Sequence, residues 1–317
     1  MGGVLALMIN PSKFVPERDI PDLTGKVVLV TGGNAGIGYY TVKELLSKNA
    51  KVYLAARSAE KAAVAIKSLE AETGKTAIFL QLDLGDLKSV RVAANTFLKQ
   101  EERLDILFNN AGVLHTDCTL LTVQGLDLQF GTNVLGPFFF TELLLRALTK
   151  SFQQNQVPAR VINTSSAGYT TAPGSGVEFN LVKPGPERDE WIKNAGNVMS
   201  GLRLYGQSKL GNIVVSNYWA KTHSDVLVSC AVHPGSTRAE ALRHQPGLIR
   251  LIMHSYMYPT PMGALAQLWA GTVAKPSEIT GQYVVPWGKV AEPEKRTKSA
   301  KLETEVIAFL KEQIQGF

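Results

Sequence analysis

The chain has 317 residues, of which 45% are apolar and 19% charged, and 33 lysines and arginines against 27 aspartates and glutamates give it a formal net charge of +6. This composition excludes a disordered chain, and the modest positive charge gives no reason to predict a nucleic-acid partner. Two cysteines without CxxC spacing, Cys118 and Cys230, and five histidines in no ligand-like pair exclude a disulfide framework and a zinc site. We therefore expect no metal, and a reducing, cytoplasmic location.

The first residues, Met1 to Asn10, are apolar but too short to span a membrane, and they lack the basic flank and cleavage site of a signal peptide. Ala6 stands where a myristoylation motif requires Ser or Thr. We interpret residues 1–22 as an N-terminal extension of a single domain that covers 23–317. Weak association of this end with a lipid surface is kept as an alternative, and no transmembrane segment is expected.

Short apolar runs alternate with helical patterns along the chain. The predicted strands are Val27–Val30, Val52–Ala55, Ala77–Leu82, Leu104–Phe108, Arg160–Ile162, Leu227–Val232 and Gln282–Val285, and the clearest helices between them are Ala59–Thr73, Leu87–Gln100 and Thr132–Phe152. Ser58 is a plausible N-cap, and Gly74 a stop, for the first of these helices. The alternation predicts βαβ units and an α/β fold of the Rossmann type: a doubly wound parallel sheet with helices on both faces. Ligands of such sheets bind at the carboxyl ends of the strands.

Two segments interrupt this alternation. Residues 168–202 are rich in glycine and proline and are long for a connection between a strand and a helix, and long irregular segments inside compact domains are often functional. Residues 239–265 carry an apolar face with methionine and tyrosine. That face fits either a helical lid or ordinary core packing.

A glycine-rich turn follows the first strand, with the sequence Thr-Gly-Gly-Asn-Ala-Gly-Ile-Gly over residues 31–38, and leads into a helix that begins near Tyr39. Free backbone N–H groups and the helix dipole at such a junction can hold a pyrophosphate. Gly32, Gly36 and Gly38 have the spacing Gly-x-x-x-Gly-x-Gly, which differs from GxGxxG. The turn predicts a dinucleotide site.

The end of the second strand indicates which dinucleotide binds. A carboxylate there would bind the ribose 2′-hydroxyl of NAD, but this strand ends in Ala56 and Arg57. A guanidinium can form a forked pair with a 2′-phosphate. Arg57 therefore favours NADP over NAD, unless it is simply an exposed loop arginine.

Tyr205 and Lys209 stand four residues apart and so share one face of a predicted helix. A phenol is a poor acid–base group at neutral pH unless a nearby cation stabilises its phenolate. Polar residues follow two of the strands, Ser165 and Ser166 after the fifth and Asn109 and Asn110 after the fourth. Asn133 interrupts an otherwise apolar helix. Together these residues predict proton transfer at a carbonyl or alcohol oxygen.

The glycine turn, the sequence Asn-Asn-Ala-Gly over 109–112, the serine before Tyr205-Gly206-Gln207-Ser208-Lys209, and His233-Pro234-Gly235 resemble the single-domain short-chain dehydrogenase/reductase family. The resemblance covers roughly residues 25–240. Within that family the chain is most similar to retinol-dehydrogenase-like enzymes and related fungal reductases.

The resemblance implies Tyr205 as proton donor or acceptor, Lys209 as ligand of the cofactor ribose and modulator of the Tyr205 pKa, Ser166 (rather than Ser165) as partner of the substrate oxygen, and Asn133 as a relay to the lysine through water. It also implies a set of cofactor-binding residues besides Tyr205, Lys209 and Arg57. These are Gly32, Asn34, Gly36, Ile37, Gly38, Asp83, Asn110, Ala111, Gly112, Pro234, Gly235, Ser236 and Thr237. Ala239 stands where the family often has a threonine, which leaves Ser236 or Thr237 to bind the carboxamide. The interval from Ser166 to Tyr205 is also long for the family, which implies that residues 168–202 are an insertion that shapes one wall of the substrate pocket.

We therefore predict an NADP-dependent oxidoreductase that transfers hydride between NADP(H) and a lipophilic ketone, aldehyde or secondary alcohol, such as a secondary metabolite or a retinoid- or steroid-like molecule. The resemblance also implies a homo-oligomer that pairs through the helices of the fourth- and fifth-strand units. The alternatives are a catalytically silent NADP-binding sensor or interaction protein, and a protein held at a lipid surface.

Overall fold

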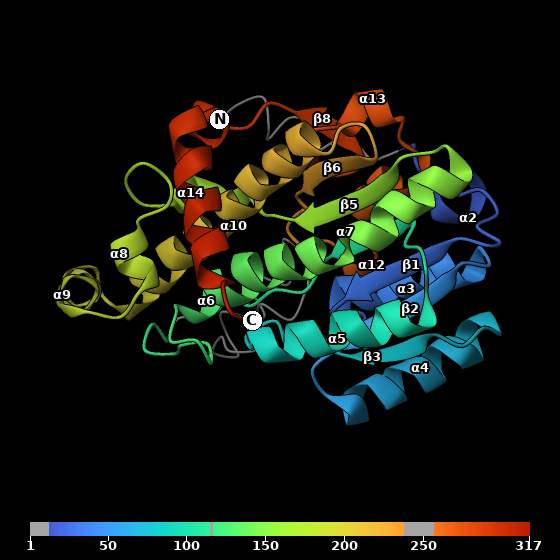
Figure 1. Cartoon of the computed structure of the whole chain (residues 1–317), viewed down its shortest axis with the longest axis horizontal. Coiled ribbons are helices and arrows are strands. Elements are labelled where there is room, and N and C mark those ends of the chain that lie inside the picture. Colours follow the sequence, from blue (N-terminus) through green and yellow to red (C-terminus); the bar gives the residue numbers. More distant parts are fainter. Residues whose placement is uncertain (1–12, 115–116, 238–256) are drawn as a thin grey trace.

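The apolar runs become the strands of one eight-stranded sheet in a computed structural model that describes residues 13–114, 117–237 and 257–317 (Figure 1). The strands are β1 (Val27–Thr31), β2 (Lys51–Ala56), β3 (Ile78–Gln81), β4 (Ile106–Asn109), β5 (Ala159–Thr164), β6 (Leu227–Val232), β7 (Tyr283–Val285) and β8 (Lys289–Ala291). The predicted fold class is confirmed, and the ends of the seven predicted strands are correct to within two residues. Only β8 was not predicted, because three residues after a glycine turn carry too little pattern.

The strand order is β3-β2-β1-β4-β5-β6-β7-β8, with every pair parallel except β7 and β8. The order changes direction between β1 and β4. At such a switch point the loops after the two central strands run to opposite faces of the sheet and leave a crevice between them. The glycine turn after β1 and the Asn109–Asn110 segment after β4 therefore lie beside each other.

Helices cover both faces of the sheet. On one face lie α3 (Gly36–Ser47), α4 (Ala59–Thr73) and α12 (Thr260–Leu268), and on the other lie α5 (Leu87–Gln100), α7 (Gly136–Asn155) and α10 (Asn197–Thr222). Side chains alternate along β1, so that Val28 and Val30 pack on the first face and Val27 and Leu29 on the second. The C-terminal helix α14 (Ala300–Gln313) packs on the outside of α10.

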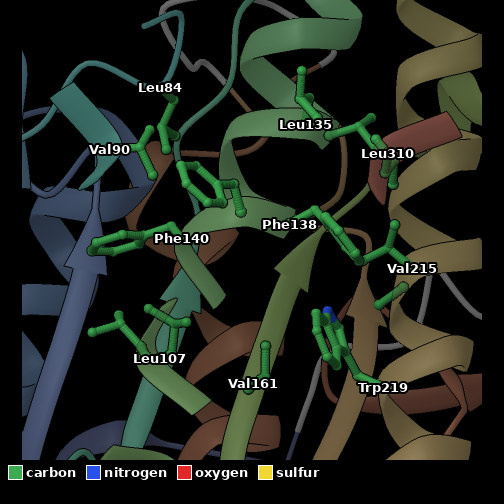
Figure 2. Close-up of a cluster of buried hydrophobic side chains, with 14 of the residues drawn as sticks. Leu84, Val90, Leu107, Leu135, Phe138, Phe140, Val161, Val215, Trp219 and Leu310 are labelled. Atoms are coloured by element: carbon green, nitrogen blue, oxygen red, sulfur yellow. The ribbon is translucent and has the colours of Figure 1, made fainter. Parts of the chain in front are cut away.

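The second face has an aromatic centre, shown in Figure 2. Phe138 of α7 stacks on Trp219 of α10 with ring centroids 5.3 Å apart, above Val161 of β5. Both aromatic side chains are fully buried. Burial of side chains of this size is worth several kcal/mol each, and it fixes α10, which carries Tyr205, against the sheet.

Local signals set the helix boundaries as predicted in the clearest case. The Ser58 hydroxyl accepts a hydrogen bond from Lys61 N at the start of α4, and Gly74, at φ +67°, ends the helix in the left-handed conformation. The other elements are short: α2 (Pro16–Asp19), α6 (Leu128–Phe130), η1 (Gly131–Leu135), η2 (Ala167–Thr171), α8 (Phe179–Val182), α9 (Pro186–Ala195), η4 (Trp269–Val273), α13 (Pro276–Ile279) and η5 (Lys295–Lys298).

The structure corrects the predicted helix over 132–152. Its first turn is the π-helix η1, which contains Asn133, and the regular α-helix begins only at Gly136. Single π-helical turns of this kind are frequent at functional sites. Helical periodicity in the sequence does not distinguish a π turn from an α turn.

The structure also shows more order in 168–202 than the glycines and prolines suggested. The segment holds most of η2, the helices α8 and α9, and the first turns of α10, which begins at Asn197. The prolines do not prevent helices here because Pro186 occupies the first turn of α9, where its missing N–H is not needed.

Most of the predicted lid, 238–256, lies outside the described residues, as do residues 1–12. The described end of the lid segment forms the start of α12, where Ala264 is buried against α3, so core packing holds for that part. Residues 13–22 of the extension bury Phe14 and Ile20. Among the helices that the structure describes, none is both long and apolar enough to cross a membrane.

Candidate active site

Tyr205 and Ser166 meet at the carboxyl end of β5. Ser166 comes two residues after the end of the strand, and its hydroxyl forms a hydrogen bond with the Tyr205 side chain. The Ser166 Oγ also accepts a hydrogen bond from Gly168 N at 3.1 Å. A Cβ atom at position 168 would lie only 3.2 Å from the Tyr205 ring, so the glycine lets the turn approach α10 closely. The Ser165 hydroxyl instead donates to the Lys209 carbonyl oxygen, so of the two serines only Ser166 faces the tyrosine. That Ser166 binds the substrate oxygen stays a prediction.

Lys209 lies one turn after Tyr205, buried beneath its ring. Its Nζ is 5.6 Å from the ring centroid and donates to the Thr164 carbonyl oxygen at 2.8 Å. Burial lowers the pKa of Lys209 to about 8, because the charged ammonium loses its hydration. Burial likewise raises the pKa of Tyr205, and the Ser166 hydrogen bond opposes that effect. That Lys209 brings the Tyr205 pKa down stays a prediction.

Asn133 is held by three hydrogen bonds within the π-helical turn η1. Its Oδ1 accepts from Val113 N at 2.7 Å, and its Nδ2 donates to the Val113 carbonyl oxygen and to Ser208 Oγ. A Cβ at Gly112 would lie 3.1 Å from both Asn133 Oδ1 and Lys209 Nζ. Asn133 and Lys209 therefore flank the same glycine without bonding directly to each other, which leaves the water relay as a proposal.

The glycine turn has the backbone that a phosphate site requires. Gly32 and Gly36 have positive φ values of +67° and +56°, and a Cβ at Gly38 would overlap the Gly32 carbonyl oxygen. Ala35 caps α3 without any side-chain hydrogen bond, so no side chain competes for the first N–H groups of the helix. Asn110 fixes the turn from the neighbouring strand, because its Nδ2 donates to the Thr31 carbonyl oxygen at 2.9 Å.

Other predicted cofactor residues follow the neighbouring strands, and they differ in burial and in hydrogen bonding. Gly235, at φ +89°, and the buried Thr237 follow β6, where Thr237 N donates to the Gly235 carbonyl oxygen. Asp83 follows β3 and accepts from Gly85 N at 2.9 Å. Arg57 follows β2 and is exposed. The Ile37 side chain packs against Gly263 of α12.

Sequence reasoning missed two buried amides that complete the site. Asn212 Nδ2 donates to the same Thr164 carbonyl oxygen as Lys209, at 3.0 Å. Gln267, from α12, accepts from Thr164 Oγ1 and donates to Thr41 Oγ1 and Asn110 Oδ1, which ties the ends of two strands to α3. Asn212 could have been found from its spacing, three residues after Lys209, but nothing near Gln267 in the sequence marks it.

Known proteins share both the sequence and the fold. The chain is 44% identical over 316 residues to a short-chain dehydrogenase/reductase of Armillaria gallica, a match that covers 99% of this chain and 98% of that protein. This chain belongs to the short-chain dehydrogenase/reductase family. Residues 26–177 also match the sequence profile of short chain dehydrogenases.

Other members of the short-chain dehydrogenase/reductase family agree with this assignment. Human retinol dehydrogenase 11 is 37% identical over 224 residues, which cover 70% of this chain and 64% of the human protein. The Pseudomonas aeruginosa RhlG/NADP active-site complex has a TM-score of 0.63 and 27% identity, and the match covers 84% of this chain and 96% of that one. The predicted family is confirmed, and with it an oxidoreductase.

Proposed function

We propose that this family member is an NADP-dependent oxidoreductase that interconverts a lipophilic ketone or aldehyde and the corresponding alcohol, with Tyr205 as the proton donor or acceptor. The observation that carries the proposal is the hydrogen bond between Ser166 and Tyr205 directly above the buried Lys209. A protein that only senses the dinucleotide would not need a buried ammonium beneath a phenol, because burial of that charge costs stability.

In the reducing direction, the Tyr205 hydroxyl gives its proton to the carbonyl oxygen of the substrate. The Ser166 hydroxyl, already oriented by Gly168 N, donates a hydrogen bond to the same oxygen. The Lys209 ammonium stabilises the resulting phenolate until Tyr205 takes up a proton again. In the oxidising direction the phenolate accepts the proton of the alcohol.

The residues at the switch point fit NADP. The uncapped start of α3 would hold the pyrophosphate, Lys209 the ribose hydroxyls, and the Gly235 turn the nicotinamide side. When bound, the cofactor supplies or accepts the hydride. The exposed Arg57 guanidinium would pair with the 2′-phosphate, and the presence of NADP in the RhlG complex supports this choice.

A groove beside the insertion supports a lipophilic substrate. Its volume is about 600 Å³, and its lining is mainly apolar, with Ala172, Pro173, Trp191, Met199 and Leu202 next to Arg203. Leu202 precedes Tyr205 by three residues on α10, so the groove runs beside the helix that carries the catalytic tyrosine. We propose that it takes the apolar part of the substrate.

The test is NADPH oxidation by the purified protein with a panel of aliphatic, aromatic and isoprenoid carbonyls. Tyr205→Phe should lower kcat about 10²–10⁴-fold, the usual contribution of a positioned acid, while the Kd for NADPH stays within about twofold. Tyr218→Phe, on the same helix, is the matched control. Full activity of Tyr205→Phe, or NADPH binding without turnover of any carbonyl by the wild type, would reject the proposal and favour the silent sensor.

A further inference from the structure

His233, the last residue before Pro234 and Gly235, is buried with 3% of its surface exposed. Its Nδ1 accepts two backbone hydrogen bonds, from Ala167 N at 3.2 Å and from Gly235 N at 3.3 Å. Its own backbone N donates to the Val284 carbonyl oxygen of β7 at 2.7 Å, which fixes the residue in the sheet. One ring atom therefore joins two turns that come from different strands.

The two turns are those that the proposed reaction must align. Ala167 directly follows Ser166, whose hydroxyl binds Tyr205. Gly235 begins the turn proposed to hold the nicotinamide side of the cofactor, and its positive φ of +89° is a conformation that glycine adopts freely. The distance between these turns sets how the substrate oxygen at Ser166 lies relative to the cofactor.

We propose that His233 is a positioning residue that holds the Ser166 turn and the Gly235 turn at a fixed separation through its Nδ1 atom. This inference rests on the proposed function. Hydride transfer depends steeply on alignment, and a misplacement of about 1 Å can cost about 10²-fold in rate. In this role His233 neither contacts the substrate nor takes part in proton transfer, and it acts only through its hydrogen bonds to the two turns.

The ring chemistry agrees with this role. An Nδ1 that accepts two N–H donors carries no proton, so the neutral ring bears its hydrogen on Nε2. Nε2 is buried and has no hydrogen-bond partner among the described residues. Burial lowers the pKa of His233 to about 4, which keeps the ring neutral and Nδ1 an acceptor at physiological pH.

Three substitutions of His233 distinguish the effect of its hydrogen-bond acceptor from the effect of its side-chain volume. His233→Asn places an amide oxygen close to the position of Nδ1 and can keep the acceptor. His233→Gln moves its polar group one bond further out, and His233→Leu has a similar volume without any acceptor. If the ring contributes only its volume, His233→Leu should lose the least kcat and the least thermal stability of the three variants.

The experiment measures kcat, the KM for a carbonyl substrate, the Kd for NADPH and the thermal midpoint of each full-length variant. We expect His233→Leu and His233→Gln to lose about 10–100-fold in kcat, with a KM within threefold of the wild type and a Kd for NADPH raised about fivefold, the equivalent of one lost hydrogen bond. His233→Asn should recover kcat to within about fivefold of the wild type, as expected when an acceptor is restored.

Wild-type kcat in His233→Leu, or equal losses in the asparagine and leucine variants, would overturn the positioning role. A loss of kcat that follows only the unfolded fraction at the assay temperature would also overturn it. These results leave the proposed function intact, because the wild type is then active. A wild type that neither binds nor oxidises NADPH would instead reject the proposed function and this role with it.

Discussion

At the level of single residues, Lys209 is a buried cation, and its burial lowers the stability of the folded protein. Burial lowers its pKa to about 8 from an ordinary value of 10.5, so the unfolded chain binds this proton more tightly than the folded protein. Burial of Lys209 therefore lowers the free energy of unfolding by its full amount below pH 8, and this loss disappears as the pH rises toward 10.5. Such a residue trades stability for function.

Lys209→Met should therefore raise the free energy of unfolding of the cofactor-free protein by about 2 kcal/mol at pH 7, after allowance for one lost hydrogen bond. Thr164 keeps a partner in the variant because Asn212 still donates to its carbonyl oxygen. Urea unfolding at pH 7 and pH 10 measures the effect, with the exposed Lys221→Met as control. A gain that does not shrink toward pH 10 would contradict the burial argument.

Arg57 carries the proposed preference for NADP. Arg57→Glu should weaken NADPH binding about 10–100-fold, the range for a lost charge-assisted hydrogen bond, and leave NADH binding nearly unchanged. Lys67→Glu, on the exposed side of α4, makes the same change of charge without facing the crevice. Titration calorimetry with both cofactors measures the two Kd values, and equal weakening for NADPH and NADH would argue against a 2′-phosphate contact.

At the scale of elements, a buried ion pair attaches the insertion to the helix segment that leads to Asn133. Arg188 of α9 donates to Asp127 Oδ2 at 2.9 Å, and both side chains are almost fully buried. Asp127 Oδ1 also accepts from Phe130 N at the start of α6, and Asp127 N donates to the Val182 carbonyl oxygen. These buried contacts attach residues 168–202 to the helices of the second face.

Removal of one partner of this ion pair should lower the free energy of unfolding more than replacement of both partners by neutral side chains. Arg188→Met leaves a buried carboxylate without its cation and should cost about 3–5 kcal/mol of unfolding free energy. The double variant Arg188→Met with Asp127→Asn should recover a large part of that loss, because asparagine still caps α6. Denaturant unfolding of the single and double variants completes the cycle, and strictly additive losses would speak against direct coupling.

The same insertion should influence which substrates bind. Trp191→Ala removes an aromatic side of the groove and should raise the KM for large apolar carbonyls about tenfold, as losses of apolar contact usually do, while small carbonyls are unaffected. Trp191→Phe keeps an aromatic ring and serves as the control. Equal KM changes for large and small substrates would place the substrate elsewhere.

At the scale of the whole molecule, α14 closes the outer side of the α7–α10 layer. Leu310 is fully buried beside Leu135 and Val215 (Figure 2), and Phe309 packs on Phe130 with ring centroids 6.1 Å apart. Figure 1 shows this helix, in red, crossing over α10. The homo-oligomer stays a prediction, and a pair built on α7 and α10 would have to accommodate α14.

Leu310→Ala should cost about 2–5 kcal/mol, as deletions of fully buried leucine side chains do. The neighbouring Lys311→Ala should cost below about 1 kcal/mol, because it removes only exposed contacts with Tyr218, a cation–π contact and a hydrogen bond. Unfolding curves give both values, and light scattering on the same samples reports the oligomeric state. A cost below 1 kcal/mol for Leu310→Ala would mean that α14 is not part of the core in solution.

Features that depend on residues close together in the chain could be predicted from the sequence alone. Continuous apolar runs predict the strands, and Ser58 and Gly74 predict the ends of α4. The spacing of the glycines predicts the turn before α3. The helical repeat places Tyr205 and Lys209 on one face of a helix. These patterns act within a few residues, so they can be read without knowing what packs against them.

Contacts between residues far apart in the chain could be identified only from the folded structure. The Thr164 carbonyl oxygen that receives Lys209 is 45 residues away, Arg188 is 61 residues from Asp127, and Ala167 is 66 residues from His233. The sequence does not reveal the acceptor role of His233, because that role also needs the Ala167 N–H, which the sheet brings beside the ring. Such contacts depend on strand order and burial, which no local pattern records.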